Sequence, residues 1–214
     1  MHTTTEQGRA RENREEELFG VADRQAGYFT AKQALETGYR YPLQHYHRER
    51  GHWVPAGHGL FRLRRYPEGE NEPLTRLWLW SRNQEGEPQA VASHERALAL
   101  WRLSDLMPER VHLSVPKGFR KRPPAGVVLH KADLAEGDVE RLNGLPVTTP
   151  LRTLLDVAED RRVSPEHLET AAREAVERGL VRRKRLRQAL SLVEDKDRRR
   201  ILEEVTGDLS GTPA

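Results

Sequence analysis

The feature that most constrains the fold is a series of short segments within residues 15–65, each closed by a glycine. Apolar residues recur at helical spacing in the first segment, and the next two segments are also patterned as short helices. Glycine after the last periodic residue is a typical helix stop. The three helices are predicted at residues 15–26, 31–36 and 42–50, which end before Gly27, Gly38 and Gly51.

Two strand-like pieces follow these helices, at residues 53–55 and 60–63. The turn-rich sequence AGHG joins them, which is suited to a hairpin. Three short helices followed by a hairpin is the element order of a winged helix-turn-helix. The sequence therefore predicts a winged helix-turn-helix domain over residues 15–65.

The remainder of the chain predicts a second domain of different character. Residues 1–14 are polar without an apolar period and are expected to be a disordered tail, and residues 66–73, with two prolines, are expected to be a linker. Residues 74–206 mix helices and strands without regular alternation, which indicates an α+β domain. Residues 207–214 are expected to be a tail. Expected strands lie at 111–115, 127–130 and 145–147, and expected helices at 74–80, 94–103, 150–158, 166–178, 181–192 and 198–205.

Composition excludes several classes of protein. The 214 residues include no cysteine, which removes disulfides, thiolate zinc sites and cysteine nucleophiles. The N-terminal segment has no apolar core of the kind that signal peptides carry, and no apolar run approaches the ~18 residues of a membrane span. The expected location is therefore the cytoplasm, without a membrane partner.

Positive charge is concentrated on the third predicted helix and the hairpin. Residues 39–65 hold six arginines against one glutamate, a net charge of +5, whereas the whole chain carries +3. A winged helix presents these two elements to DNA. Side chains on the helix are expected to reach base edges, and wing arginines to contact phosphates. The expected DNA-binding residues are Lys32, Arg40, Tyr41, Gln44, His45, Arg48, His52, Arg62, Arg64 and Arg65. An ordinary solvated charged face would also produce this clustering.

A second basic cluster opens a helix near the C-terminus. Residues 173–200 hold eleven basic and five acidic residues, and cations at the start of a helix gain nothing from its dipole. We interpret the cluster as a secondary contact to DNA or to a partner protein, and it could also support self-association on DNA. A solvated basic face is the equal alternative. The residues concerned are Arg182, Arg183, Lys184, Arg185 and Arg187.

Chemistry-bearing patterns are otherwise sparse. His45 and His47 are two residues apart on a helix and point away from each other, and no HExxH motif occurs. His94, His112 and His130 are interpreted as core or surface residues. No predicted strand carries the acid-x-Lys pair of a magnesium nuclease, and no GxSxG motif occurs. We therefore expect no metal, no cofactor and no enzyme activity.

Several segments resemble a known family. The run GYFTAKQA at residues 27–34, with Gly38, Gly51 and GLFRL at residues 59–63, is similar to the N-terminal winged-helix domain of AbiEi-family antitoxins. Residues 93–100, VHLSVP at residues 111–116, and LPVTTPLRTLLD at residues 145–156 resemble the domain that follows in that family. The last segment is the most specific of these, and the resemblance covers roughly residues 15–190.

The resemblance implies an antitoxin of a type IV toxin–antitoxin pair that also represses its own operon. Its partners would be double-stranded operator DNA and a nucleotidyltransferase-like toxin, the latter as a functional rather than a necessarily physical partner. The family's DNA contacts would map onto Arg40, Gln44, His45, Arg48, Arg62 and Arg64. A solitary transcriptional regulator and a truncated relative of a DNA-processing nuclease remain the alternatives, as does an interaction module that no longer binds DNA.

Overall fold

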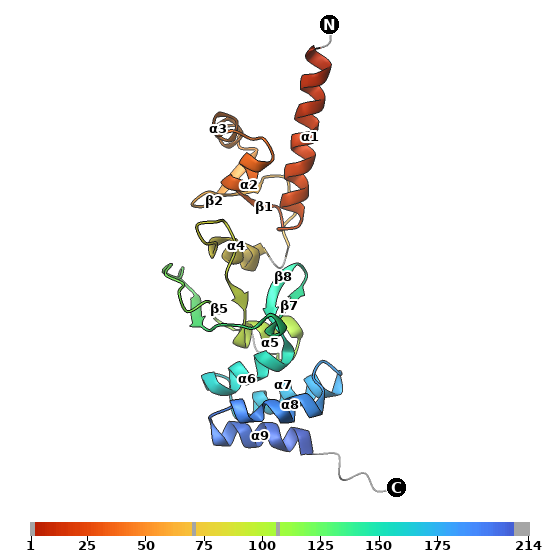
Figure 1. Cartoon of the computed structure of the whole chain (residues 1–214), viewed down its shortest axis with the longest axis vertical. Coiled ribbons are helices and arrows are strands. Elements are labelled where there is room, and N and C mark those ends of the chain that lie inside the picture. Colours follow the sequence, from red (N-terminus) through yellow and green to blue (C-terminus); the bar gives the residue numbers. More distant parts are fainter. Residues whose placement is uncertain (1–2, 70–71, 106–107, 208–214) are drawn as a thin grey trace. The chain divides into compact units, whose positions relative to one another are not determined.

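The chain divides into two compact units, residues 1–89 and residues 90–214 (Figure 1). The computed structural model describes residues 3–69, 72–105 and 108–207, and side chains from residue 8 onward. Residues 208–214 of the expected C-terminal tail lie outside the described residues. Each unit has its own hydrophobic core and is described separately below.

The N-terminal unit is a winged helix-turn-helix, as predicted. Its elements are α1 (Thr3–Asp23), β1 (Tyr28–Thr30), α2 (Ala31–Glu36), α3 (Tyr41–Glu49), β2 (Trp53–Gly57), β3 (Leu60–Leu63) and α4 (Glu72–Trp80). Helices α2 and α3 form the helix-turn-helix, and strands β2 and β3 form the wing. Strand β1 pairs with β3 on the other side, so that the sheet order is β1-β3-β2 and both pairs are antiparallel.

Local chemistry explains the start of α2. Thr30 accepts a hydrogen bond at Oγ1 from the backbone of Gln33 (3.1 Å), while the Gln33 side chain accepts one from the backbone of Thr30 (2.9 Å). This reciprocal capping box satisfies two amides that the helix leaves unpaired. The sequence predicted the helix at residues 31–36 but not strand β1, because three residues carry too little periodicity to be recognised.

An aromatic cluster fills the centre of this unit. The ring of Phe29 lies 4.7 Å from that of Trp53 in an edge-to-face arrangement and 5.9 Å from that of Phe61. Leu18 and Ala22 of α1 complete this core from the helix side. Edge-to-face aromatic pairs add about 0.5–1.5 kcal/mol beyond the area they bury. The core therefore fixes α1 against the sheet and holds the wing strands in place.

Helix α1 is longer than predicted. It begins at Thr3, although the sequence indicated a disordered tail over residues 1–14. Its first turns contain glutamate, arginine, glutamine and alanine, which are strong helix formers without an apolar pattern. Arg11 and Glu15 add an (i, i+4) pair at 3.0 Å. The absence of an apolar stripe therefore did not prevent continuation of the helix that Leu18 and Ala22 anchor.

Helix α4 belongs to the N-terminal unit, although the sequence placed residues 74–80 in the second domain. Tyr28 donates a hydrogen bond to Glu72 Oε1 (2.7 Å), and Arg62 lies 3.2 Å from Glu72 Oε2. Burial, followed by this hydrogen bond, raises the pKa of Tyr28 to about 12 and keeps the phenol protonated. Leu79 packs with Tyr28 and Leu60. These contacts join the helix to the sheet, so the division between units falls after residue 89.

The C-terminal unit combines a mixed sheet with a group of helices. Its elements are β4 (Val91–Ala92), α5 (His94–Trp101), β5 (Val111–Val115), β6 (Val127–Lys131), η1 (Glu136–Asp138), β7 (Val139–Leu142), β8 (Leu145–Thr148), α6 (Pro150–Asp160), α7 (Pro165–Glu177), α8 (Arg183–Ala189), η2 (Leu190–Leu192) and α9 (Lys196–Gly207). The sheet order is β6-β5-β4-β8-β7. Pairs β5–β6 and β4–β8 are parallel, while β4–β5 and β7–β8 are antiparallel.

This architecture confirms the α+β class. The main core lies among the helices, where the side chains of Leu154, Leu168, Leu186 and Leu202 are fully buried. Strands β4 and β7 were not predicted, because one is two residues long and the other carries charged residues on its exposed face. Among the helices that the structure describes, none combines the length and the apolar composition needed to cross a membrane.

The segment at residues 145–156, the most specific part of the family resemblance, forms a strand-to-helix junction. Thr149 caps α6 by accepting a hydrogen bond from the backbone of Arg152 (3.3 Å). The Arg152 guanidinium pairs with Asp156 at 2.7 Å. The hydroxyl groups of Thr148 and Thr153 are 2.7 Å apart. The motif therefore has a structural role, because its hydrogen bonds and ion pair join the polar side chains where β8 turns into α6.

We expect Glu72→Gln to destabilise the N-terminal unit by about 1–3 kcal/mol. The substitution removes the charge that pairs with the largely buried Arg62 and weakens the acceptor of the Tyr28 hydroxyl. Hydrogen exchange of the β3 amides, read by mass spectrometry under native conditions, measures the loss. Glu17→Gln, which alters an exposed carboxylate on α1, is the control. Equal protection in both variants would show that α4 does not stabilise the sheet.

Candidate nucleic-acid interface

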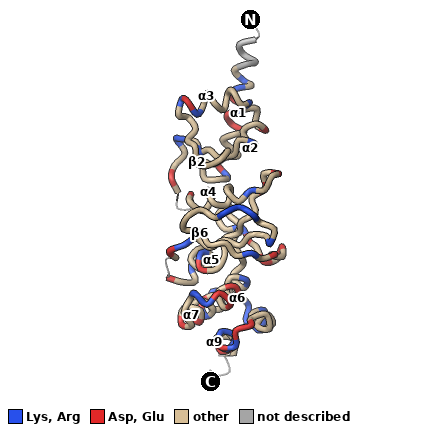
Figure 2. Tube along the Cα trace, turned by 90° about the vertical axis from the view of Figure 1, so that its left-hand side faces the viewer, with Lys and Arg blue, Asp and Glu red and all other residues tan. Residues whose placement is uncertain are grey.

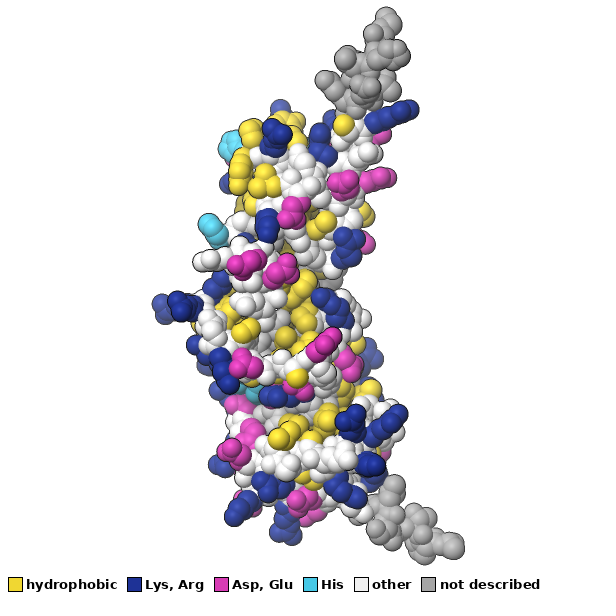
Figure 3. All heavy atoms as spheres, viewed as in Figure 1, with side chains coloured by type: hydrophobic (Ala, Val, Ile, Leu, Met, Phe, Trp, Pro, Cys, Tyr) yellow, Lys and Arg dark blue, Asp and Glu magenta, His cyan; other side chains and the backbone are white. Residues whose placement is uncertain are grey.

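Helix α3 presents an exposed stripe of three side chains that can contact a ligand. Tyr41, His45 and Arg48 are at positions i, i+4 and i+7 and therefore share one face of the helix. All three are exposed, Tyr41 with 69% of its surface accessible. Arg40, also exposed, stands at the N-cap position. Figure 3 shows basic, histidine and hydrophobic side chains gathered over α3, at the upper left of the view. We refer to these four residues as the α3 stripe.

The opposite side of α3 is anchored by stacked rings. His47 stacks on Trp53, with ring centroids 5.0 Å apart and planes inclined by 17°, and lies edge-on to Tyr39. Burial, and then the neighbouring His52, lowers the pKa of His47 and favours its neutral form. His52 is exposed and its Nδ1 lies 3.2 Å from Nδ1 of His47. His52, a predicted DNA contact, is therefore accessible, and it lies beside the ring of His47, which packs on Trp53 of the core.

Gln44 does not take the position that the sequence predicted. Gln44 is buried, with 4% of its surface exposed. Its side-chain amide donates hydrogen bonds to the carbonyl groups of Tyr39 (2.8 Å) and Ala31 (3.1 Å). These bonds join α3 to α2 and to the turn between them. The expected contact with a base edge is thus replaced by a role in the helix-turn-helix itself. The hydrophobic pattern of the sequence could not reveal this, because it assigns polar residues such as Gln44 to the solvent-exposed face of a helix.

Arg62 is also a structural residue. Its guanidinium pairs with Glu72 and donates to the carbonyl groups of Tyr66 (2.9 Å) and Pro67 (3.0 Å). Only 12% of its side chain is exposed, so the expected phosphate contact is not on the surface. Lys32 is exposed on α2, where its ammonium group donates to the carbonyl of Glu85.

Two further predicted DNA-binding arginines, Arg64 and Arg65, lie in a groove of the N-terminal unit. Arg64 and Arg65 follow β3 and line it, with Phe19 and Tyr66 on its apolar side. Arg64 also donates to the carbonyl of Gly51, at the end of the turn after α3. The groove therefore places positive charge beside aromatic surface and the carboxylate of Asp23, at the C-terminal end of α3.

Arg50 is a candidate that the sequence prediction omitted. It lines the same groove, and its guanidinium lies 5.5 Å from the ring centroid of the exposed Tyr46. The (i, i+4) spacing of these two residues was a usable signal, since such pairs adjoin on a helix. The pair extends the basic and aromatic surface from the helix to the groove.

The C-terminal basic cluster is divided between two roles. Arg183 donates to the carbonyl of Val205 (3.0 Å) and Arg187 to that of Thr206 (2.8 Å), which are the last carbonyls of α9. These two cations thus meet the negative end of another helix dipole, a compensation that the sequence did not reveal. Arg182, Lys184 and Arg185 are exposed. Figure 2 shows Lys and Arg interleaved with Asp and Glu along the neighbouring helices.

A winged helix-turn-helix followed by an α+β unit defines a two-part architecture. Comparison with known families identifies the second part. The family described as the AbiEi antitoxin C-terminal domain matches residues 90–204, which is more than half of the chain. The chain belongs to this family, which is a family of antitoxins and not of enzymes. The matched range begins at the residue where the second unit begins.

Structural comparison agrees on the fold. The crystal structure of the RV2827C protein from Mycobacterium tuberculosis matches with a TM-score of 0.55 and 19% sequence identity. The match covers 89% of this chain and 75% of that chain. At this identity the likeness shows a shared fold that extends through both units. Comparison with curated proteins returned no match.

We expect Gln44→Ala to lower the free energy of unfolding by about 1–3 kcal/mol, because it removes the side-chain donor to the buried carbonyl of Tyr39 and to the partly buried carbonyl of Ala31. Urea denaturation followed by circular dichroism measures the change. His45→Ala, at the adjacent exposed position, is the matched control and should change stability by less than about 0.5 kcal/mol. A Gln44 variant as stable as the control would return this side chain to the set of possible base contacts.

We expect Arg187→Ala to loosen α9 by about 0.5–1.5 kcal/mol, because a carbonyl at the helix end loses its charged donor. Hydrogen exchange of the α9 amides provides the measurement. Arg185→Ala removes a cation of the same helix whose side chain is exposed and should leave α9 unchanged. If both variants behaved alike, Arg187 would be no more than part of a solvated face.

Proposed function

We infer that this protein is a DNA-binding antitoxin and transcriptional autorepressor of a toxin–antitoxin operon. It contacts double-stranded operator DNA through α3 and the wing. Such binding takes place where the operon is transcribed, which puts the protein in the cytoplasm. The observation that carries this proposal is the α3 stripe, which a helix-turn-helix presents on the exposed face of its second helix.

The chemistry of the stripe suits a duplex. Arg48 is exposed in the last turn of α3 and has the forked donors that pair with guanine O6 and N7. Tyr41 and His45 supply hydrogen-bonding and apolar contacts on the same face. Arg50, Arg64 and Arg65 line the groove at the C-terminal end of α3, and we assign to them the phosphate contacts that fix the orientation of a reading helix. Base readout and backbone positioning are thereby assigned to different residues.

The C-terminal unit connects this DNA binding to antitoxin activity. Membership of the AbiEi antitoxin family supports a toxin partner in general. We assign the partner as a nucleotidyltransferase-like toxin whose effect is opposed through shared operon control, without requiring direct contact. The exposed residues Arg182, Lys184 and Arg185 are available for self-association on DNA or for an acidic partner surface. If the gene stood alone, a solitary regulator would replace the antitoxin assignment.

We expect Arg48→Ala to reduce the preference for operator over random duplex by about 1–3 kcal/mol, through loss of a base-edge contact. Fluorescence anisotropy measures it, with the promoter region of the protein's own gene and a random duplex of equal length as probes. Arg65→Ala should instead weaken both duplexes similarly and lower the salt slope by about one.

Arg200→Ala is the matched control, since this exposed arginine pairs with Glu204 on α9. It should leave both affinities unchanged. Equal operator preference in the wild type and in Arg48→Ala would contradict the assignment of α3 as the reading helix. Cleavage of the duplex in the presence of Mg²⁺ would replace the antitoxin proposal with the nuclease alternative.

A further inference from the structure

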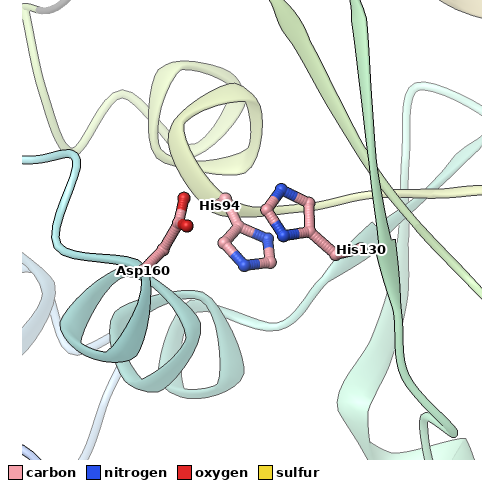
Figure 4. Close-up of side chains that lie close together, drawn as sticks. All are labelled: His94, His130 and Asp160. Carbon is pink, nitrogen blue, oxygen red and sulfur yellow. The ribbon is translucent and has the colours of Figure 1, made fainter.

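Three histidines from separate segments of the C-terminal unit converge around one point. His94 opens α5, His112 lies in β5 and His130 lies in β6. The rings of His94 and His130 are stacked, with centroids 3.5 Å apart. Nδ1 of His112 lies 3.0 Å from Nε2 of His130. Figure 4 shows the carboxylate of Asp160, at the end of α6, directed toward the His94 and His130 rings.

The fold explains this convergence. Strands β5 and β6 are parallel, with Ser114 paired to His130 and His112 paired to Val128. Side chains two residues apart share one face of a strand, so His112 and His130 project from the same face of the sheet. His94 joins them from the first position of α5, where its φ of +52° lies in the left-handed region. Each histidine stands alone in the sequence, which is why no metal-ligand spacing was recognised.

A chain of polar contacts selects the tautomers of two rings. Nε2 of His112 lies 3.9 Å from Glu95 Oε1. A neighbouring carboxylate favours the tautomer in which the nitrogen that faces it carries the proton. Nδ1 of His112 then has a lone pair and accepts the hydrogen bond from Nε2 of His130. The remaining nitrogen of His130, Nδ1, is left with its lone pair.

The same reasoning applies to His94. Its Nδ1 lies 2.9 Å from the hydroxyl oxygen of Ser93. In the tautomer whose Nδ1 donates to this oxygen, Nε2 of His94 carries the lone pair. Burial, together with the neighbouring histidines, lowers the pKa of His94 to about 2, and burial lowers that of His130 to about 4. Both rings are neutral at physiological pH, the form in which imidazole binds metals.

Asp160 contributes a carboxylate that the protein does not saturate. Its Oδ2 is shielded from solvent and accepts no hydrogen bond within the described residues, although the Nε of Arg162 lies 3.3 Å away. The Arg162 side chain is 46% exposed and can turn to solvent. One ring nitrogen each of His94 and His130 and one oxygen of Asp160 all lie within 4.8 Å of one another.

We propose that Nε2 of His94, Nδ1 of His130 and the carboxylate of Asp160 bind a divalent transition-metal ion of the Zn²⁺ class. Two imidazoles and one carboxylate are ligands that Zn²⁺ prefers, and Mg²⁺ prefers oxygen alone. Ligands about 2.1 Å from an ion are roughly 3.4 Å apart, and binding requires the stacked rings of His94 and His130 to turn until their lone pairs converge on the ion. His112 and Glu95 act as positioning residues that orient His130 through its other nitrogen. The ion cross-links α5, β6 and α6.

The test uses the full-length chain after treatment with a chelator and dialysis. Isothermal titration with Zn²⁺ at neutral pH should give one ion per chain and raise the melting temperature, while Mg²⁺ at the same concentration should give no heat of binding. In ¹⁵N spectra of the histidine rings, Zn²⁺ should shift Nε2 of His94 and Nδ1 of His130. An absence of stoichiometric Zn²⁺ binding would overturn the proposal.

Isosteric variants separate ligands from positioning residues. Asp160→Asn should weaken Zn²⁺ binding by more than about a hundredfold, and Glu95→Gln by about ten- to a hundredfold. His167→Gln removes an exposed histidine of α7 and should leave binding unchanged. Circular dichroism of the metal-free variants checks that each one folds. Unaltered binding in Asp160→Asn, or an equal loss in His167→Gln, would refute the site.

Discussion

Buried hydrogen-bonding groups must have partners, and this constraint sorts the charged and polar residues of the chain into structural and accessible sets. Glu72 is the clearest case, because its carboxylate receives both the Tyr28 hydroxyl and the Arg62 guanidinium. Without these contacts α4 would have only its apolar side to hold it against the sheet. The boundary between the two units depends on this one carboxylate more than on any change of composition.

The need of buried groups for hydrogen-bond partners also determines which arginine side chains are accessible to a ligand. Arg62 is occupied by Glu72, and Arg183 and Arg187 are occupied by the end of α9. Arg48 and Arg65 remain exposed on the N-terminal unit. Net charge therefore overstates the cationic surface that is accessible, which includes the exposed face of α3 and the segment after β3.

The C-terminal unit shows two uses of buried polarity. At the junction of β8 and α6, the hydroxyl groups of Thr148 and Thr153 contact each other and Asp156 Oδ1 pairs with Arg152, so the most recognisable motif of the family serves the fold. In the histidine cluster, ring nitrogens lie beside an oxygen of Asp160 that is shielded from solvent and accepts no hydrogen bond within the described residues.

The sequence by itself determined the winged helix-turn-helix and the α+β class, because helix periodicity and glycine stops act over a few positions. Family membership also followed from local motifs, above all residues 145–156. Only the tertiary structure decided that Gln44 and Arg62 are internal, that α4 joins the first unit, and that His94, His130 and Asp160 meet. These outcomes depend on strand pairing and on contacts between distant segments, for which no short-range pattern exists.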